Sequence, residues 1–181
     1  RELLELFSMW IDENGDGAYS ENDVKSAAKA FTGWASKPTP PPFFLGPFPM
    51  EFNFDENDHD NSEKEFLGEK GNFNGEDIVE LVSKHPSTAK FICMRLYLYF
   101  VSEEENWDEI NKLSDVYLTS DGDIKKVLEN IFKSDHFKSR EIMFKKVKSP
   151  SDLVFGVTRL VDRFEIPELD FFMAPGSLGG I

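Results

Sequence analysis

Asp12-Glu-Asn-Gly-Asp-Gly-Ala-Tyr-Ser-Glu-Asn-Asp23 is the stretch on which the expected fold depends, because it lies between two segments with helical periodicity. Hydrophobic residues recur at one-turn spacing in both flanks: upstream at Leu3, Leu4, Phe7 and Ile11, and downstream at Val24, Ala27, Ala28 and Phe31. This recurrence places the hydrophobic side chains of each flank on one helical face. The sequence therefore predicts a helix–loop–helix within residues 1–34.

The order of oxygen-bearing residues in this loop is that of an EF-hand. Such a loop needs side-chain oxygens at positions 1, 3 and 5, a glycine at 6, a backbone carbonyl at 7 and a carboxylate at 12. These positions are filled, in order, by Asp12, Asn14, Asp16, Gly17, Ala18 and Asp23. We therefore predict a Ca²⁺ ion as cofactor, bound by the four Asp and Asn side chains and the Ala18 carbonyl. Because Asp is one methylene shorter than the usual Glu at position 12, binding should be weak.

A second interpretation of the same residues needs no metal. Ser20, followed three residues later by Asp23, is a capping box that starts a helix. The Asn-Gly and Asp-Gly pairs of the loop are also common in turns. Neither feature explains the acids at positions 1 and 5 in register with the glycine, so we favour the cation loop.

Composition limits the class of protein. The chain has 181 residues, of which 40 % are hydrophobic, as expected for one globular domain over residues 1–181. Its net charge of −14 argues against nucleic acid or an anionic membrane as partner. The sequence contains no run of eighteen apolar residues, so it predicts no transmembrane segment. The single Cys93 excludes an internal disulfide and a cysteine-based zinc site.

Residues 35–70 predict extended chain. The proline-rich segment Lys37–Pro49 cannot be helical. We expect its Phe43, Phe44 and Phe48 to fill a gap between helices; a peptide- or sugar-binding arm is the other interpretation. Alternation over Met50–Phe54 predicts a strand, which we expect to pair with residues 65–67 as a hairpin.

Residues 75–165 predict helices. Their expected spans are Gly75–Lys84, Ser87–Val101, a segment marked by Trp107 to Tyr117, a segment marked by Ile124 to Phe132, and a last helix capped at Ser149 that runs to about Phe164. His85-Pro86 separates the first two, and we expect His85 to be an end-of-helix residue rather than a ligand. The predicted fold is mainly α, a multi-helix domain with a minor β-hairpin.

A weaker candidate site lies in the acidic connection between the two expected strands. His59 and Asp60, with Lys64 nearby, could form an acid/base cluster, because a carboxylate beside an imidazole orients it and tunes its pKa. Neighbouring His and Asp residues are common in solvated turns, which is the alternative. No catalytic residue is assigned with more support than these three.

The motifs follow one another as in the bacterial family called domain of unknown function 1800, which this chain resembles over nearly its whole length. They are Arg1-Glu-Leu-Leu-Glu-Leu-Phe7, Tyr19-Ser-Glu-Asn-Asp-Val24, Phe31-Thr-Gly-Trp34, His59-Asp60 leading to Lys64, Leu67-Gly68, Asn74-Gly-Glu-Asp77, His85-Pro-Ser-Thr-Ala89 and Lys148-Ser-Pro150. The resemblance implies a piece of a longer, mostly helical protein that is usually exported to the periplasm or cell surface. Its partners would be other parts of that protein or a neighbouring exported protein. It implies no established activity or catalytic residues.

We therefore expect a calcium-stabilised structural or binding module of an exported bacterial protein. A hydrolase-like enzyme that uses His59, Asp60 and Lys64 is the alternative function.

Overall fold

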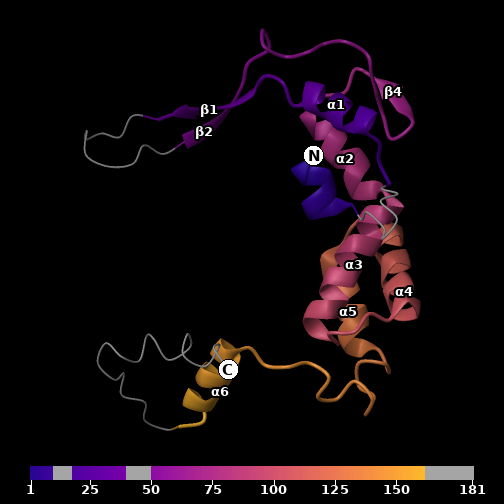
Figure 1. The fold of residues 1–181 in the computed structure, drawn as a ribbon, viewed down its shortest axis with the longest axis vertical. Coiled ribbons are helices and arrows are strands. Elements are labelled where there is room, and N and C mark those ends of the chain that lie inside the picture. The colour runs from indigo at the N-terminus through magenta and orange to yellow at the C-terminus, as the bar shows by residue number, and fades with distance from the viewer. Residues whose placement is uncertain (10–17, 40–49, 162–181) are drawn as a thin grey trace.

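The structure, a computed structural model, describes residues 1–9, 18–39 and 50–161 and is mainly helical (Figure 1). The helices are the π-helix η1 (Leu3–Ser8) and the α-helices α1 (Glu21–Ala30), α2 (Gly75–Lys84), α3 (Pro86–Phe100), α4 (Trp107–Thr119), α5 (Ile124–Lys133) and α6 (Pro150–Thr158). The strands are β1 (Trp34–Pro38), β2 (Met50–Phe54), β3 (Lys64–Phe66) and β4 (Glu69–Gly71). The predicted mainly α fold with a minor β component is confirmed.

Two hydrophobic clusters hold the helices together. The first lies between α3, α4 and α5 and includes the buried residues Cys93, Tyr97, Ile110, Val127 and Ile131. The second joins η1, α1, β3 and α2 through Leu4, Met9, Ala27, Ala30, Phe66, Ile78 and Val82. The buried residues recur at one-turn spacing along these helices, as their sequences predict. Helix α6 contributes no buried residue.

The helices that follow residue 74 begin and end close to their predicted bounds. Helix α2 matches its expected span, and α3 begins one residue before Ser87. The Nδ1 atom of His85 accepts a hydrogen bond from the Ser87 backbone N–H (3.1 Å), so His85 caps α3 as an end-of-helix residue. The prediction for the last helix is too long, because α6 ends at Thr158; Phe164 lies outside the described residues.

The strands exist, but one predicted pairing is wrong. Strand β2 pairs antiparallel with β1, placing Trp34 opposite Phe54, and β3 pairs with β4 instead of with β2. Two left-handed residues, Leu67 (φ +50°) and Gly68 (φ +82°), form the tight β3–β4 turn. This is the backbone that the twist of a two-residue hairpin requires, but it strains Leu67 because leucine rarely adopts a positive φ.

The N-terminal helix also differs from its prediction. Helix η1 ends at Ser8, and Met9 is extended (φ −127°, ψ 138°); Ile11, at the end of the predicted helix, lies outside the described residues. Its π winding rotates the buried face: Ser8 and Met9 are buried, whereas Phe7 is 65 % exposed. The Ser8 hydroxyl tolerates this burial because it donates a hydrogen bond to the Leu3 carbonyl (2.5 Å).

Asp23 connects helix α1 to the β3–β4 hairpin. One carboxylate oxygen accepts hydrogen bonds from the backbone N–H and hydroxyl of Ser20 (both 2.6 Å), and the other accepts one from the Leu67 backbone N–H (2.7 Å). Burial raises the pKa of this carboxyl, but the hydrogen bonds from Ser20 and Leu67 outweigh it and lower the pKa below its ordinary value. The capping box predicted from the sequence is therefore present, and it also supports the strained turn at Leu67.

Replacing Asp23 by Asn should lower the free energy of unfolding by about 2 kcal/mol, because the amide group turns one acceptor oxygen into a donor facing other donors. The stabilisation by Asp23 is present above the ordinary carboxyl pKa of 3.8 and is lost as the pH falls below it. The Asp23→Asn protein should thus lose part of the acid sensitivity of the wild type. Urea unfolding between pH 7 and pH 2.5 measures both effects, with Asn22→Ala in the same helical turn as control. Equal stability of wild type and Asp23→Asn at pH 7 would contradict this role.

Candidate binding groove

The predicted calcium ligands lie partly beyond what the structure describes. Asp12, Asn14 and Asp16 fall outside the described residues. Ala18 packs against the second hydrophobic cluster, which joins η1, α1, β3 and α2, and Asp23 forms the hydrogen bonds given above. Within residues 1–9, 18–39 and 50–161, no three His, Cys, Asp or Glu side chains gather closely enough to hold a metal ion. Ca²⁺ binding by the loop stays a prediction.

His59 and Asp60 attach the β2–β3 connection to the end of α1. The Nδ1 atom of His59 lies 2.9 Å from the Thr32 carbonyl oxygen, which assigns the proton to Nδ1, and the Asp60 backbone N–H donates to the Thr32 hydroxyl (2.8 Å). The His59 ring meets Phe54 edge-on at 5.4 Å between centroids. The Asp60 carboxylate accepts a hydrogen bond from the Ser62 backbone N–H (2.8 Å), and the hydrogen bonds from Ser62 lower its pKa.

Lys64 is a structural residue at the start of β3. It is 3 % exposed, and its ammonium group donates hydrogen bonds to the carbonyls of Asp60 (2.5 Å) and Ser62 (3.0 Å) and to the side-chain oxygen of Asn72 (3.4 Å). A buried ammonium needs such acceptors to offset its loss of hydration. Among the described residues, no contact of His59, Asp60 or Lys64 points to catalysis.

Cys93 lies in the core and is not a candidate nucleophile. Its side chain is fully buried in the α3–α4–α5 cluster, as its apolar surroundings in the sequence indicate. Burial raises the pKa of the thiol to about 11, so the thiolate needed for nucleophilic attack is scarce at neutral pH.

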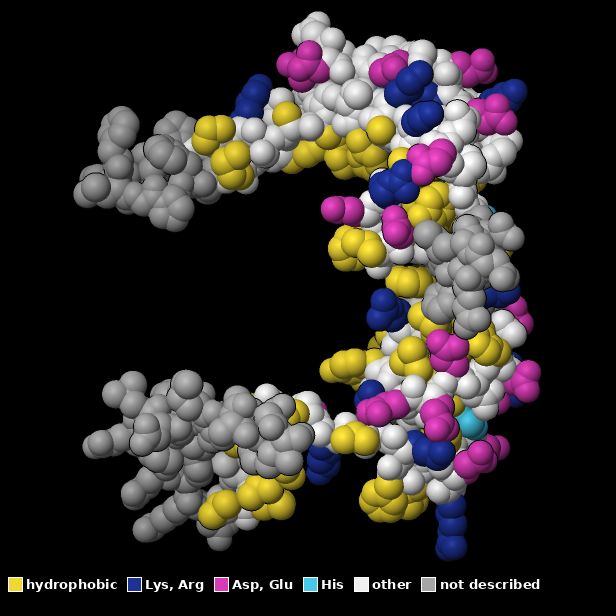
Figure 2. Space-filling model, viewed as in Figure 1, with side chains coloured by type: hydrophobic (Ala, Val, Ile, Leu, Met, Phe, Trp, Pro, Cys, Tyr) yellow, Lys and Arg dark blue, Asp and Glu magenta, His cyan; other side chains and the backbone are white. Residues whose placement is uncertain are grey.

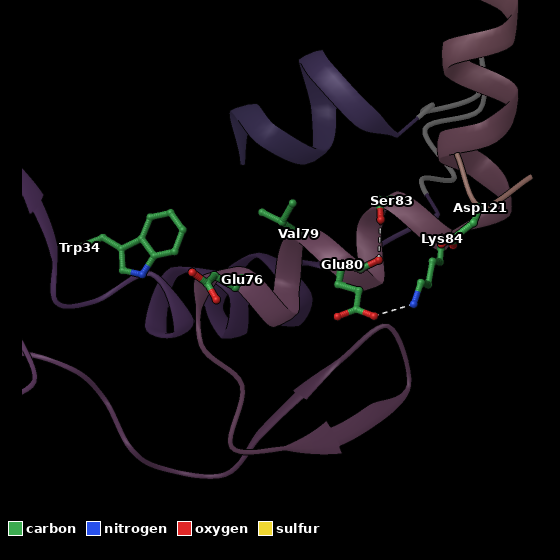
Figure 3. Close-up of a pocket in the computed structure, with 7 residues that line it drawn as sticks. All are labelled: Trp34, Glu76, Val79, Glu80, Ser83, Lys84 and Asp121. Atoms are coloured by element: carbon green, nitrogen blue, oxygen red, sulfur yellow. Dashed lines mark hydrogen bonds and ion pairs between the residues drawn. The ribbon is translucent and has the colours of Figure 1, made fainter. Parts of the chain in front are cut away.

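Three adjoining pockets form a groove along α2. The central pocket has a volume of about 480 Å³ and is lined by Trp34, Glu76, Val79, Glu80, Ser83, Lys84 and Asp121 (Figure 3). A pocket of about 220 Å³ shares Trp34 and Glu76 with it and adds Phe52, Phe54 and Asn74. A pocket of about 180 Å³ shares Ser83, Lys84 and Asp121 and adds Tyr117, Leu118 and Gly122. Together they define the α2 groove, which runs from the β1–β2 hairpin past α2 to the turn between α4 and α5.

The hairpin end of the groove is aromatic and exposed. Trp34 is 38 % exposed and Phe52 is 66 % exposed, with their rings edge-on at 5.1 Å between centroids. Figure 2 shows hydrophobic side chains gathered along one side of the hairpin and on the neighbouring body of the molecule. An exposed apolar patch next to polar groups is typical of an interaction surface.

Trp34 is held against the start of α2 by a close backbone approach. A Cβ atom on Gly75 would lie 2.5 Å from the indole ring of Trp34, so a glycine is required there. Phe31 packs edge-on against the same indole at 5.0 Å, and Gly33 with φ +82° turns the chain from α1 into β1. The hairpin and α2 are therefore in direct contact at this point, and the groove follows from that contact.

The polar lining of the groove is acidic. Lys84 pairs with Glu80 at 2.5 Å; this hydrogen bond and charge raise the pKa of Lys84 and lower that of Glu80, and the charge of Asp121 raises the Lys84 pKa further. In the described part of the chain, neither Glu76 nor Asp121 belongs to an ion pair. Three carboxylates and one ammonium group line the central pocket, so the net charge of its lining is −2.

The sequence did not predict this groove, since its lining comes from β1, β2, α2, the end of α4 and the α4–α5 turn. The Phe31-Thr-Gly-Trp34 motif was one available signal, because it places an aromatic residue after a turn glycine. The peptide- or sugar-binding arm considered there rested on Phe43, Phe44 and Phe48, which lie outside the described residues.

Comparison with known families matches residues 1–176 to a family described as "Protein of unknown function (DUF1800)". The resemblance drawn from the ordered motifs is thereby confirmed. Comparisons with curated proteins and with solved structures give no match. None of the described helices is long and apolar enough to cross a membrane.

Proposed function

The chain belongs to the DUF1800 family, and from this premise we propose that it is a binding module of an exported bacterial protein whose α2 groove holds an extended segment of a partner polypeptide. The observation that carries the proposal is the groove itself, with exposed Trp34 and Phe52 at one end and three pockets in a row. Clefts with aromatic anchors and a few polar groups are usual in recognition sites.

The shape of the groove favours an elongated ligand over a compact one. The pockets adjoin along α2, from Phe54 at the hairpin to Gly122 beyond α4. The two-stranded β1–β2 sheet at one end leaves strand edges unpaired within the described residues, and an extended peptide can add to such an edge. Backbone hydrogen bonds to the edge and side chains in the pockets would then act together.

The chemistry of the lining favours binding over catalysis. The Ser83 hydroxyl donates to the Glu80 carbonyl within its own helix (2.8 Å), and the Lys84 ammonium is paired with the Glu80 carboxylate (Figure 3). Among the described residues, the Ser83 hydroxyl thus donates to a backbone carbonyl and not to the side chain of a base, so it lacks the hydrogen bond that would activate a nucleophile. Charge and aromatic surface, by contrast, are what a recognition site needs.

Phe52→Ala should weaken peptide recognition without unfolding the protein, because the Phe52 side chain is mostly exposed. A displayed library of random peptides is panned on the wild type, on Phe52→Ala and on Tyr99→Ala. Tyr99 is the matched control, since it is 70 % exposed near the far end of α3. Peptides enriched on the wild type should bind Phe52→Ala about tenfold or more weakly, as expected for an aromatic anchor. Tyr99→Ala should bind like the wild type. A library that enriches no peptide on the wild type, or peptides that bind Phe52→Ala unchanged, would contradict the proposal.

We also propose that Ca²⁺ at the loop stabilises this module outside the cytoplasm. Support comes from the register of Asp12, Asn14, Asp16 and the Ala18 carbonyl, and from the crowding of acids in a chain with a net charge of −14. Asp23 is the ambiguous ligand, since its carboxylate already accepts hydrogen bonds from Ser20 and Leu67. Asp12 is therefore the residue to change.

Calcium should raise the thermal midpoint of the wild type by about 5 to 10 °C at a hundredfold excess over its dissociation constant. Binding to the folded state alone contributes about 2.7 kcal/mol under that condition. Asp12→Ala should lose this rise, whereas Asn22→Ala, outside the predicted ligand positions, should keep it. Differential scanning calorimetry in calcium and in chelator measures the effect. Equal midpoints of the wild type in both solutions would refute calcium stabilisation.

A further inference from the structure

We infer that the α2 groove selects a cationic segment, in which two Lys or Arg side chains about four residues apart face Glu76 and Asp121. This inference rests on the proposed binding function and names the chemical class of its partner. It follows from the charges of the lining, their separation and the position of Trp34.

The charges of the groove favour a cationic partner. Glu80 is neutralised by Lys84, so Glu76 and Asp121 are the carboxylates that no ion pair of the described residues compensates. An anionic segment would meet two like charges, and a neutral one would leave them without a partner. A segment with two cationic side chains offers each carboxylate a partner, and charges arranged in this way select partners by repelling the wrong ones.

An aromatic ring lies beside one of these charges. Glu76 and Trp34 both line the central pocket and its hairpin-side neighbour, and Figure 3 shows the Glu76 carboxylate close to the Trp34 indole. A Lys or Arg side chain at this point can contact the indole by a cation–π interaction while its charge meets the carboxylate. Tryptophan is the ring that binds cations best, so the hairpin end should contribute most of the selectivity.

The distance between the two carboxylates sets the spacing of the cationic side chains. Glu76 lies in the first turn of α2, and Asp121 shares its pocket with Lys84 at the last residue of α2. Eight residues of α-helix span roughly 12 Å at ~1.5 Å per residue. Extended chain covers that length in about four residues at ~3.3 Å each. Because side chains alternate along extended chain, residues i and i+4 also point to the same side.

The test uses three synthetic peptides with a threonine background. The first has lysines at positions i and i+4, the second has the same lysines acetylated, and the third has lysines at i and i+5, which point to opposite sides. Isothermal titration calorimetry with the intact 181-residue chain should show the first peptide binding about tenfold or more tightly than either of the others. The preference should shrink as salt is raised, because exposed charges are screened.

Glu76→Gln tests whether the groove causes this preference. It should weaken binding of the lysine i,i+4 peptide about tenfold and leave the acetylated peptide unchanged. Glu105→Gln is the matched control, since Glu105 is exposed beyond the far end of α3 and changes the net charge equally. Equal weakening by both substitutions would overturn the inference, because it would mean unspecific attraction to a chain of charge −14.

The outcomes also separate this inference from the proposed function. If the acetylated peptide binds the wild type as tightly as the lysine peptide, the selection of cations is refuted while the groove remains a peptide site. If none of the three peptides binds and the random library enriches nothing, the proposed function and this inference both fail.

Discussion

The hydrogen bonds of the Asp23 carboxylate are the interaction on which the arrangement of the N-terminal half depends. They start α1 through Ser20 and fix the β3–β4 turn through Leu67. The left-handed backbone of Leu67 is costly for a leucine, and a charged acceptor aimed at its N–H offsets part of that cost. Helix α1 leads into β1, and β4 leads into α2, so this carboxylate joins the two segments that carry the walls at the hairpin end of the groove.

Other buried polar contacts complete this frame. Lys64 donates hydrogen bonds to two carbonyls of the β2–β3 connection, and His59 joins the same connection to Thr32, just after the end of α1. A half-satisfied polar group in such a place would be costly, and a satisfied one fixes a unique geometry. The residues that most resembled an acid/base cluster in the sequence therefore serve to position the hairpin, and Gly75 lets that hairpin contact α2 through Trp34.

The sequence predicted the features that depend on neighbouring residues, namely helix spans and a helix cap. The spans of α2 and α3 followed from hydrophobic periodicity and from the His85-Pro86 break, and the capping box at Ser20 followed from its spacing to Asp23. Pairing of β2 could not be predicted in the same way, because alternation over Met50–Phe54 indicates a strand but does not identify its partner. The π winding of η1 also escaped prediction, since the face it buries includes Ser8 and excludes Phe7.

The sequence could not predict the groove, because Glu76 and Asp121, the two acids of its central pocket outside the Lys84–Glu80 ion pair, are far apart in the chain. Their nearness to a common pocket results from the packing of α2 against α3 and α4, where the Tyr117 hydroxyl donates to the Ser83 carbonyl (3.1 Å). Glu76 lies in the first turn of a helix, and Asp121 is a turn residue with a left-handed backbone (φ +57°). Neither feature indicates a binding site by itself.

The central claim is that a partner polypeptide occupies the groove at Trp34, and the indole N–H resonance of Trp34 reports on this directly. Heteronuclear NMR spectra recorded during titration with a peptide enriched from the library follow that resonance, assigned through the Trp34→Phe variant. The account predicts a saturable shift of the Trp34 indole together with the backbone amides of Glu76 and Asp121, while the Trp107 indole stays in place. Saturable binding that leaves the Trp34 resonance and these amides unmoved would contradict it.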